Sequence, residues 1–349
     1  MSSPLPGRPS EVSPYHAGER AVQRRASVHD RMEQVGRRVI RTFMPDQHRE
    51  LFAALPFALV GSLDAHYRPW ASVLVGHPGF MQSPDPQTLQ ISTRCVWGDP
   101  LAHHLGGGAQ LGVLGIQLET RRRNRMNGTI IARTDEGITV HVEQSFGNCP
   151  KYIQARQPHF AADQATVGTP RAVRHESSLL SRTAIDLIAR ADTFFIATAS
   201  PLAGRVTSDA AEGVDISHRG GKPGFVHVGV QADRTLLTSP DFVGNFFFNT
   251  LGNVAANPHA GLLFIDFASG DLLSLTGEAS IIWSGPRVDA FAGAQRLLQF
   301  RVGEGVAIAE GVPLRWSEPA FAPQLAATGS WAETVNARSV GEYGADAGR

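Results

Sequence analysis

One feature limits the fold of this chain more than any other: the same order of short motifs occurs twice. The recurrence is seen at four equivalent pairs: Pro78 and Pro223, Thr88 and Thr235, Gly112 and Gly261, and Gly128 and Gly277. The offsets are 145, 147, 149 and 149 residues, so the spacing grows by only four residues along the whole copy. A repeat of this length is the size of a domain. The 349 residues are therefore expected to form two similar domains.

Composition predicts where these domains begin and end. We expect a helical N-terminal extension at 1–45, a first domain at 46–157, a linker at 158–180, a second domain at 181–327 and a loose tail at 328–349. The linker mixes Pro, Gly, Thr and charged residues without any period, and the tail is rich in Gly and Ala. Residues 18–40 alternate charged and apolar residues at helical spacing, and helices are also expected from Pro45 and from Thr183.

The first domain consists mainly of short β-rich runs separated by Gly, Pro and Asp. Six strands are predicted, at 57–64, 70–75, 88–92, 110–116, 125–132 and 137–143. Short strands with turn residues between them are typical of an antiparallel barrel. The fold class expected is therefore mainly β with flanking helices (β-barrel, α+β). The second half is expected to repeat the same order, a helix followed by strands.

Charge and cysteine content exclude several kinds of function. Lys plus Arg equals Asp plus Glu at 32 each, so no bulk electric field attracts nucleic acid or an anionic membrane. Cys95 and Cys149 lack the spacing of a zinc site or a disulfide framework, and the 13 histidines show no metal-binding pattern. No signal-like segment or membrane-length apolar run is present. We expect a cytoplasmic protein without nucleic-acid, membrane or metal partners.

The order of motifs in the second half carries a family resemblance. These motifs are Phe194-Phe-Ile-Ala-Thr, Ser217-His-Arg-Gly-Gly, Thr235-Leu-Leu-Thr-Ser-Pro-Asp-Phe-Val-Gly-Asn, Asn257-Pro-His-Ala-Gly and Thr276-Gly-Glu-Ala. Together they resemble the pyridoxamine 5'-phosphate oxidase-like FMN-binding split-barrel family, closely over 185–285 and more loosely over 50–156. The resemblance implies two tandem split barrels, FMN as cofactor and a flavin site where two barrels meet. Single-barrel members form that junction by homodimerisation, whereas this chain can form it internally as a pseudo-dimer, which leaves a further homodimer open.

Several second-half residues are candidates for holding FMN. Arg219 offers a cation beside the Ser217 hydroxyl, and Gly220 allows a backbone to approach an anion closely. Thr238, Ser239 and Asn245 add two hydroxyls and an amide, and Asn249 is a further candidate cofactor contact. The alternative is that these residues form ordinary polar turns.

The chain departs from the family after Asn245, where a basic residue is common and Phe246-Phe-Phe stands instead. Arg122 and Arg123 are candidates for the missing charge, contributed by the first copy. In a strand, Arg121, Arg123 and Arg125 would share one face and Arg122 the other, so they cannot all reach one ligand. A solvated strand edge is the alternative. Ser72, the first-copy counterpart of Ser217, has no Gly-flanked arginine beside it, which favours the second copy for the phosphate.

The resemblance favours an FMN-dependent oxidoreductase acting on an unknown small molecule. Flavin carries the redox chemistry in such proteins, so no acid–base dyad is required in the sequence. The Trp-x-x-x-Arg-Leu-x-Pro ending of true pyridoxamine phosphate oxidases is absent, so a vitamin B6 substrate is not assigned. The alternative is a non-catalytic flavin- or haem-binding split-barrel protein.

Overall fold

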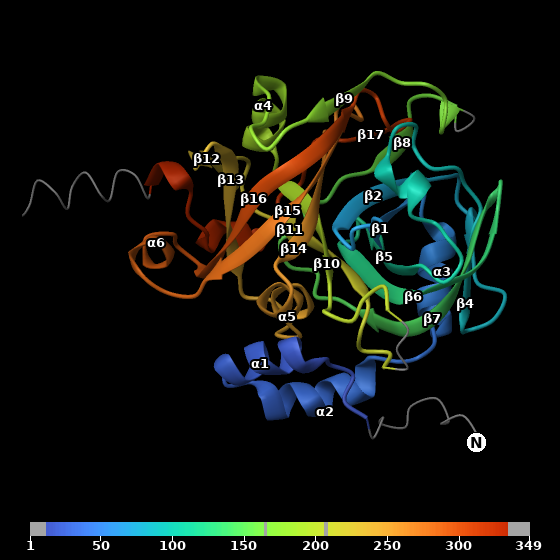
Figure 1. The fold of residues 1–349 in the computed structure, drawn as a ribbon, viewed down its shortest axis with the longest axis horizontal. Coiled ribbons are helices and arrows are strands. Elements are labelled where there is room, and N and C mark those ends of the chain that lie inside the picture. Colours follow the sequence, from blue (N-terminus) through green and yellow to red (C-terminus); the bar gives the residue numbers. More distant parts are fainter. Residues whose placement is uncertain (1–11, 164–165, 206–208, 334–349) are drawn as a thin grey trace, which may run out of the picture.

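Two large antiparallel sheets are the central elements of the computed structural model, which describes residues 12–163, 166–205 and 209–333 (Figure 1). The first contains β1 (Phe57–Leu63), β2 (Pro69–Val75), β3 (Met81–Gln82), β4 (Thr88–Ile91), β5 (Gln110–Gln117), β6 (Arg122–Thr134) and β7 (Gly137–Gly147). The second contains β9 (Val173–Glu176), β10 (Thr193–Ala199), β11 (Val214–Gly220), β12 (His227–Gln231), β13 (Arg234–Phe242), β14 (His259–Ile265), β15 (Leu272–Ile282) and β16 (Ala294–Ile308). A small separate sheet pairs β8 (Pro158–Phe160) with β17 (Leu314–Trp316).

Helices flank these sheets. They are α1 (Ala17–Arg25), α2 (His29–Val39), α3 (Asp46–Ala54), α4 (Arg182–Arg190), α5 (Asn249–Ala256) and α6 (Pro286–Asp289), with short 3₁₀ turns η1 (Pro100–His103) and η3 (Pro323–Ala327). None of the helices within the described ranges has the length and apolar character needed to cross a membrane. The terminal residues 1–11 and 334–349, which include most of the predicted tail, lie outside the described residues.

The two large sheets have the same strand order. The first runs β2-β1-β5-β6-β7-β4-β3 and the second runs β11-β10-β14-β15-β16-β13-β12. Each strand of the first sheet thus has a counterpart in the second: β1 corresponds to β10, β2 to β11, β3 to β12, β4 to β13, β5 to β14, β6 to β15 and β7 to β16. The six strands predicted from the sequence are confirmed, and β3 is added because two residues are too few to produce a pattern.

Helix and linker predictions differ from the structure in detail. The helical stretch predicted at 18–40 is divided into α1 and α2, because Ser27 between them has a left-handed φ of 56°. The segment 158–180, predicted as a linker, contains β8 and β9, and β9 pairs with β16. A run of only three or four residues gives too short an alternation to recognise.

The repeated glycines are found where the two sheets cross. A Cβ atom on Gly112 of β5 would lie 2.7 Å from the Val214 carbonyl oxygen of β11. The equivalent Gly261 of β14 faces β2 in the same way, with a Cβ position 2.5 Å from the Pro69 carbonyl oxygen. Both positions need glycine because the backbone of the other sheet lies directly on them. Close packing of the two sheets therefore explains why glycine recurs at these two equivalent positions.

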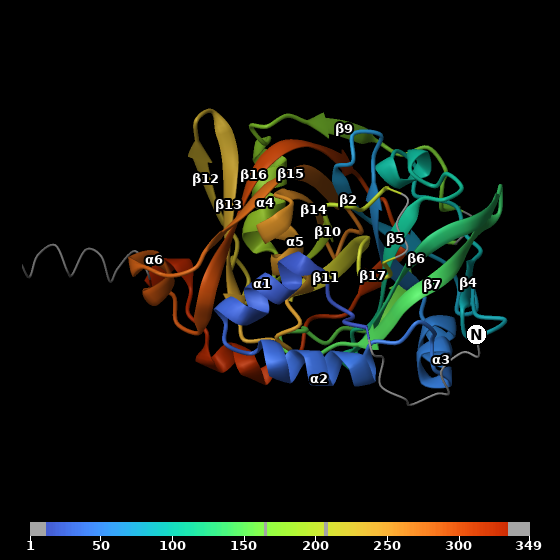
Figure 2. The same ribbon diagram turned by 60° about the horizontal axis from the view of Figure 1, so that its bottom comes forward.

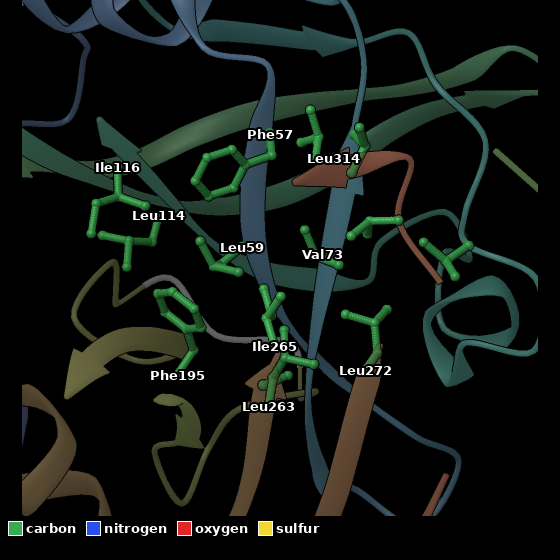
Figure 3. Packing of buried hydrophobic residues seen from close by; sticks show 14 of the residues in the cluster. Phe57, Leu59, Val73, Leu114, Ile116, Phe195, Leu263, Ile265, Leu272 and Leu314 are labelled. Atoms are coloured by element: carbon green, nitrogen blue, oxygen red, sulfur yellow. The ribbon is translucent and has the colours of Figure 1, made fainter. Parts of the chain in front are cut away.

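A hydrophobic core lies between the two sheets and takes side chains from both (Figure 3). In the close view Leu59 and Val73 of the first sheet face Phe195, Leu263 and Leu272 of the second. Each of these side chains is at most 1 % exposed. Removal of such apolar area from water is the main favourable term in folding. The two halves are thus joined by a core that neither half completes alone.

The N-terminal helices pack on the second half of the chain. In both ribbon views α1 lies against α5, with α2 beside it (Figures 1 and 2). Contact is close because two glycines meet: a Cβ on Gly18 would overlap the Gly252 carbonyl, and a Cβ on Gly252 would lie 2.5 Å from the Glu19 Cα. The first turn of α5 is therefore held in place by the N-terminal extension.

A buried histidine in α3 predicts part of the pH dependence of stability. His48 is buried, with Nδ1 2.8 Å from the Ser145 hydroxyl, and burial followed by repulsion from Arg41 and Arg122 lowers its pKa to about 4. Its folded pKa is below the unfolded value of about 6.5, so its contribution is complete above pH 6.5 and is lost as pH falls toward 4. His48→Gln should remove about 3 kcal/mol of this pH dependence, measured by urea unfolding across that range. Parallel curves for the two proteins would contradict this prediction.

Candidate functional site

A cavity of about 90 Å³ lies where the two halves meet. It is bounded by β6 of the first sheet, by β11 and the start of β16 of the second, by the segment after β13 and by the first turn of α5. Its lining residues are Arg123, Arg125, Asn148, Ser217, His218, Arg219, Asp241, Phe242, Val243, Gly244, Asn245, Phe246, Phe248, Asn249, Thr250, Leu251 and Arg296. The lining is therefore polar and rich in arginine.

Four arginines from three strands converge on this cavity. Arg123 and Arg125 share one face of β6, as strand alternation requires, while Arg219 comes from β11 and Arg296 from β16. Arg123 donates from Nε to the Cys149 carbonyl at 2.9 Å. The guanidinium groups are thus brought together by non-local strand pairing.

Two carboxylates partly balance these charges. Arg125 pairs with Asp215 at 2.9 Å, and Asp241 lies 3.6 Å from both Arg219 and Arg296. Four positive charges against two negative charges leave an excess of two. Burial, followed by repulsion from Arg125 and Arg219, lowers the pKa of Arg123 to about 9, which still leaves it charged at neutral pH. The guanidinium groups of the site therefore repel one another, and a bound anion would offset that repulsion.

Several buried donor atoms of the cavity also lack a hydrogen-bond acceptor. Within the described part of the chain, Nε of Arg125, Nε of Arg219, Nη1 of Arg296 and Nδ2 of Asn148 make no hydrogen bond. A buried donor without a partner costs about 1–3 kcal/mol. Several such donors around one small space are what an oxygen-rich anion such as phosphate would satisfy.

The first turn of α5 adds backbone polarity to the same space. Phe248 precedes the helix in a left-handed conformation and provides no side-chain cap, while Asn249, Thr250 and Leu251 line the cavity. The first backbone N–H groups of a helix have no partner within the helix, and together with the helix dipole they favour anions. The helix and the arginines therefore favour the same kind of ligand.

The family resemblance places a basic residue close to the position that Phe246-Phe-Phe occupies. In this chain Arg296 of β16 brings a positive charge to the same region. The Arg296 guanidinium lies over the Phe248 ring, 5.1 Å from its centroid. Phe247 is buried instead among Tyr15 and Phe146. Within this aromatic run, Phe247 therefore packs in the core, whereas Phe248 makes a cation–π contact with Arg296.

The structure brings together five of the predicted site residues: Ser217, Arg219, Asn245, Asn249 and Arg123. Their positions are linked by polar contacts. Ser217 accepts a hydrogen bond from Arg125, Asn245 donates to Asn148 Oδ1 at 3.3 Å, and Asn249 donates to the buried Glu19 of α1. These residues are separated by as much as 126 positions in the sequence.

The other four predicted residues do not line the cavity. Arg122 lies on the opposite face of β6 and donates to the Gln47 carbonyl at 3.1 Å. Thr238 and Ser239 are buried in β13, where Thr238 accepts from Gln299 of β16 at 3.4 Å. Gly220, the fourth, ends β11. Sequence reasoning did not name Arg296, Asp241 or Asn148, and it considered Arg125 only through strand alternation.

Gly220 is required by packing of the chain on itself. A Cβ at this position would overlap the carbonyl oxygen of Tyr152, which belongs to the segment that follows β7. Gly220→Ala should therefore destabilise the fold by about 1–3 kcal/mol, as measured by urea unfolding. Gly107→Ala is the matched control, because a Cβ there has nothing within 4 Å. Equal stability of the two variants would contradict this packing role.

The cationic lining does not recur at the equivalent positions of the other copy. Register places Leu74 where β11 has Arg219, and places Leu272 and Ser274 where β6 has Arg123 and Arg125. Leu74 and Leu272 are buried in apolar clusters, and the Ser274 hydroxyl donates to the Ala71 carbonyl at 3.2 Å. Apolar packing takes the place of the arginines there.

Comparison with known proteins gives only remote structural likenesses. No family model matches the chain, and no curated protein matches it in sequence. Among solved structures, HupZ of Group A Streptococcus is 14 % identical and covers 36 % of this chain and 90 % of its own, with a TM-score of 0.26. A pyridoxamine 5'-phosphate oxidase-related, FMN-binding protein of Nostoc punctiforme is 10 % identical, covering 40 % and 95 %, with a TM-score of 0.25. The haem storage protein HutZ of Vibrio cholerae is 13 % identical, covering 38 % and 95 %, with a TM-score of 0.24. TM-scores this low do not indicate a function.

Proposed function

We propose that the arginine-lined cavity binds the phosphate group of FMN and that the chain is an FMN-dependent oxidoreductase of a small molecule. The proposal includes two tandem split barrels that act as an intramolecular pseudo-dimer in the cytoplasm. The observation that carries it is the set of buried guanidinium and amide donors without acceptors around one small cavity. The motifs that resemble the FMN-binding split-barrel family favour FMN over other phosphate compounds as the ligand.

The residues fit the phosphate end of the cofactor. The excess of two positive charges matches a phosphate monoester dianion, and the volume of about 90 Å³ suits a group of that size. Whole small-molecule ligands need about 300–1,000 Å³. The flavin ring system would therefore extend beyond this cavity, with only the phosphate inside it.

The residues of the chain would bind and orient the cofactor. Arg123, Arg125, Arg219 and Arg296 would neutralise the phosphate, while Asn148 and the first turn of α5 would donate further hydrogen bonds. Bound FMN supplies the hydride-transfer chemistry.

The experiment that tests this proposal is the absorbance spectrum of freshly purified protein, followed by heat release and chromatography of any chromophore. We expect the two flavin bands in the near-ultraviolet and the blue, and release of FMN. A colourless protein that also fails to bind added FMN would contradict the proposal.

One residue favours the haem-binding alternative enough for it to be tested. His218 lines the same cavity, is 3 % exposed, and within the described residues its Nε2 has no hydrogen-bond partner. Burial, with repulsion from Arg123 and Arg219, holds its pKa well below the usual value, so the imidazole is neutral and able to ligate a metal. A Soret band after haem titration that is lost in His218→Ala would support this alternative. The small volume of the cavity favours phosphate.

A further inference from the structure

A second and larger cavity is lined mainly by the second half, with Arg156 of the first half in its wall. Its volume is about 380 Å³, which is in the range of about 300–1,000 Å³ typical of small-molecule sites. It is bounded by the end of α4, the start of β10, the end of β14 and the segment from β17 onward. It shares no lining residue with the arginine-lined cavity.

Two buried donors at this cavity lack acceptors. Arg156 is 7 % exposed and Trp316 is 6 % exposed, and both line the cavity. Neither Nη1 of Arg156 nor Nε1 of Trp316 has a hydrogen-bond partner in the part of the chain that the structure describes. A buried indole N–H normally finds a partner. Two such donors at one cavity point to a ligand that carries acceptor atoms.

Charges around the cavity favour an uncharged ligand. The Arg156 guanidinium is already paired with Asp192 at 2.6 Å, and Arg190 pairs with Asp266, also at 2.6 Å. Glu318 is a fifth charged lining residue and gives the lining an excess of one negative charge. A carboxylate or phosphate would therefore meet repulsion here, whereas a carbonyl oxygen would accept from the free donors without that cost.

Aromatic side chains form flat walls for such a ligand. Trp316 meets Phe267 edge to face with ring centroids 5.1 Å apart, and the Arg156 guanidinium stacks 4.5 Å from the Phe267 centroid. Phe321 also lines the cavity and is 50 % exposed, more than is usual for such a large apolar side chain. Flat apolar walls with a few fixed donors suit planar ring compounds.

We propose that this cavity is a second ligand site, which takes a neutral planar ring compound with carbonyl-type acceptors. Arg156 and Trp316 donate to the acceptors, and Phe267, Trp316 and Phe321 contact the ring. The site is independent of the phosphate proposal, because its residues and its preferred charge both differ.

Coumarin is the probe, since it is planar, bicyclic and neutral and carries a lactone carbonyl. Titration calorimetry on the full chain should show saturable binding, with weaker binding of the carboxylate derivative of coumarin. Trp316→Phe removes the indole N–H and retains an aromatic ring, so coumarin affinity should fall about fivefold. Binding of naphthalene, which has no acceptor, should fall less in the same substitution, because it loses only part of the ring contact.

Trp97→Phe is the matched control, because Trp97 is 46 % exposed and does not line the cavity. If Trp316→Phe does not fold, Phe321→Ala at an exposed position supplies the same test through lost ring contact. Saturating inorganic phosphate should leave coumarin affinity unchanged, which separates this site from the phosphate cavity. Absence of coumarin binding, or equal affinity in wild type, Trp316→Phe and Phe321→Ala, would overturn the proposal.

Discussion

Replacing Arg219 by glutamine should weaken the binding of inorganic phosphate by about tenfold to a hundredfold. Arg219 lines the cavity, and its Nε makes no hydrogen bond among the described residues. Its guanidinium lies 3.6 Å from the Asp241 carboxylate, which also faces Arg296. Glutamine keeps much of the length and polarity but removes the charge, so the loss reports a charge-assisted contact. Titration calorimetry at low ionic strength measures the affinity directly, since salt screens such contacts.

Arg122→Gln is the matched control for this prediction. It removes the same charge from the neighbour of Arg123, but the Arg122 side chain lies outside the cavity and contacts the Gln47 carbonyl. Phosphate affinity should change little in this variant. Equal losses in both variants would indicate a general charge effect, and no loss in either would place phosphate elsewhere.

Phe195→Ala should destabilise the whole chain by about 3–5 kcal/mol. Phe195 belongs to the second sheet but is buried in the core that both sheets share (Figure 3). Since neither half completes that core alone, the two halves should unfold in one transition. Urea unfolding followed by circular dichroism and by tryptophan fluorescence measures both quantities, because coincident curves indicate a single transition.

The control for the core prediction is Ile131→Ala. Ile131 is 60 % exposed, so its truncation should change stability by about 0.5 kcal/mol or less. Two separated transitions in the wild type, or a loss in Phe195→Ala no larger than in the control, would contradict the shared core.

Much of the frame can be predicted from local sequence because its causes are local. Alternating apolar residues bounded by Gly, Pro and Asp locate the long strands within a few residues. Gly112 and Gly261 indicate the repeat because each has to admit a strand of the other sheet. Short strands such as β3 and β9 escape prediction, since their pairing partners rather than their own residues determine them.

The site is predicted only where its residues lie within recognisable motifs. Arg219 stands next to Gly220 with Ser217 two residues before it, and strand alternation places Arg123 and Arg125 on one face. Asp241 and Arg296 come together because β13 and β16 place them directly opposite one another, 55 positions apart in the chain. Such a pairing depends on sheet register and leaves no local signal.

The most direct test of the account is the affinity of the purified apoprotein for FMN and for riboflavin, which differ only by the phosphate. FMN should bind at least about a hundredfold more tightly, since several charged groups would contact its phosphate. Arg219→Gln should reduce this ratio while leaving riboflavin affinity unchanged. Equal affinities for the two flavins, or binding of neither, would contradict the central claim that the cavity holds the phosphate of FMN.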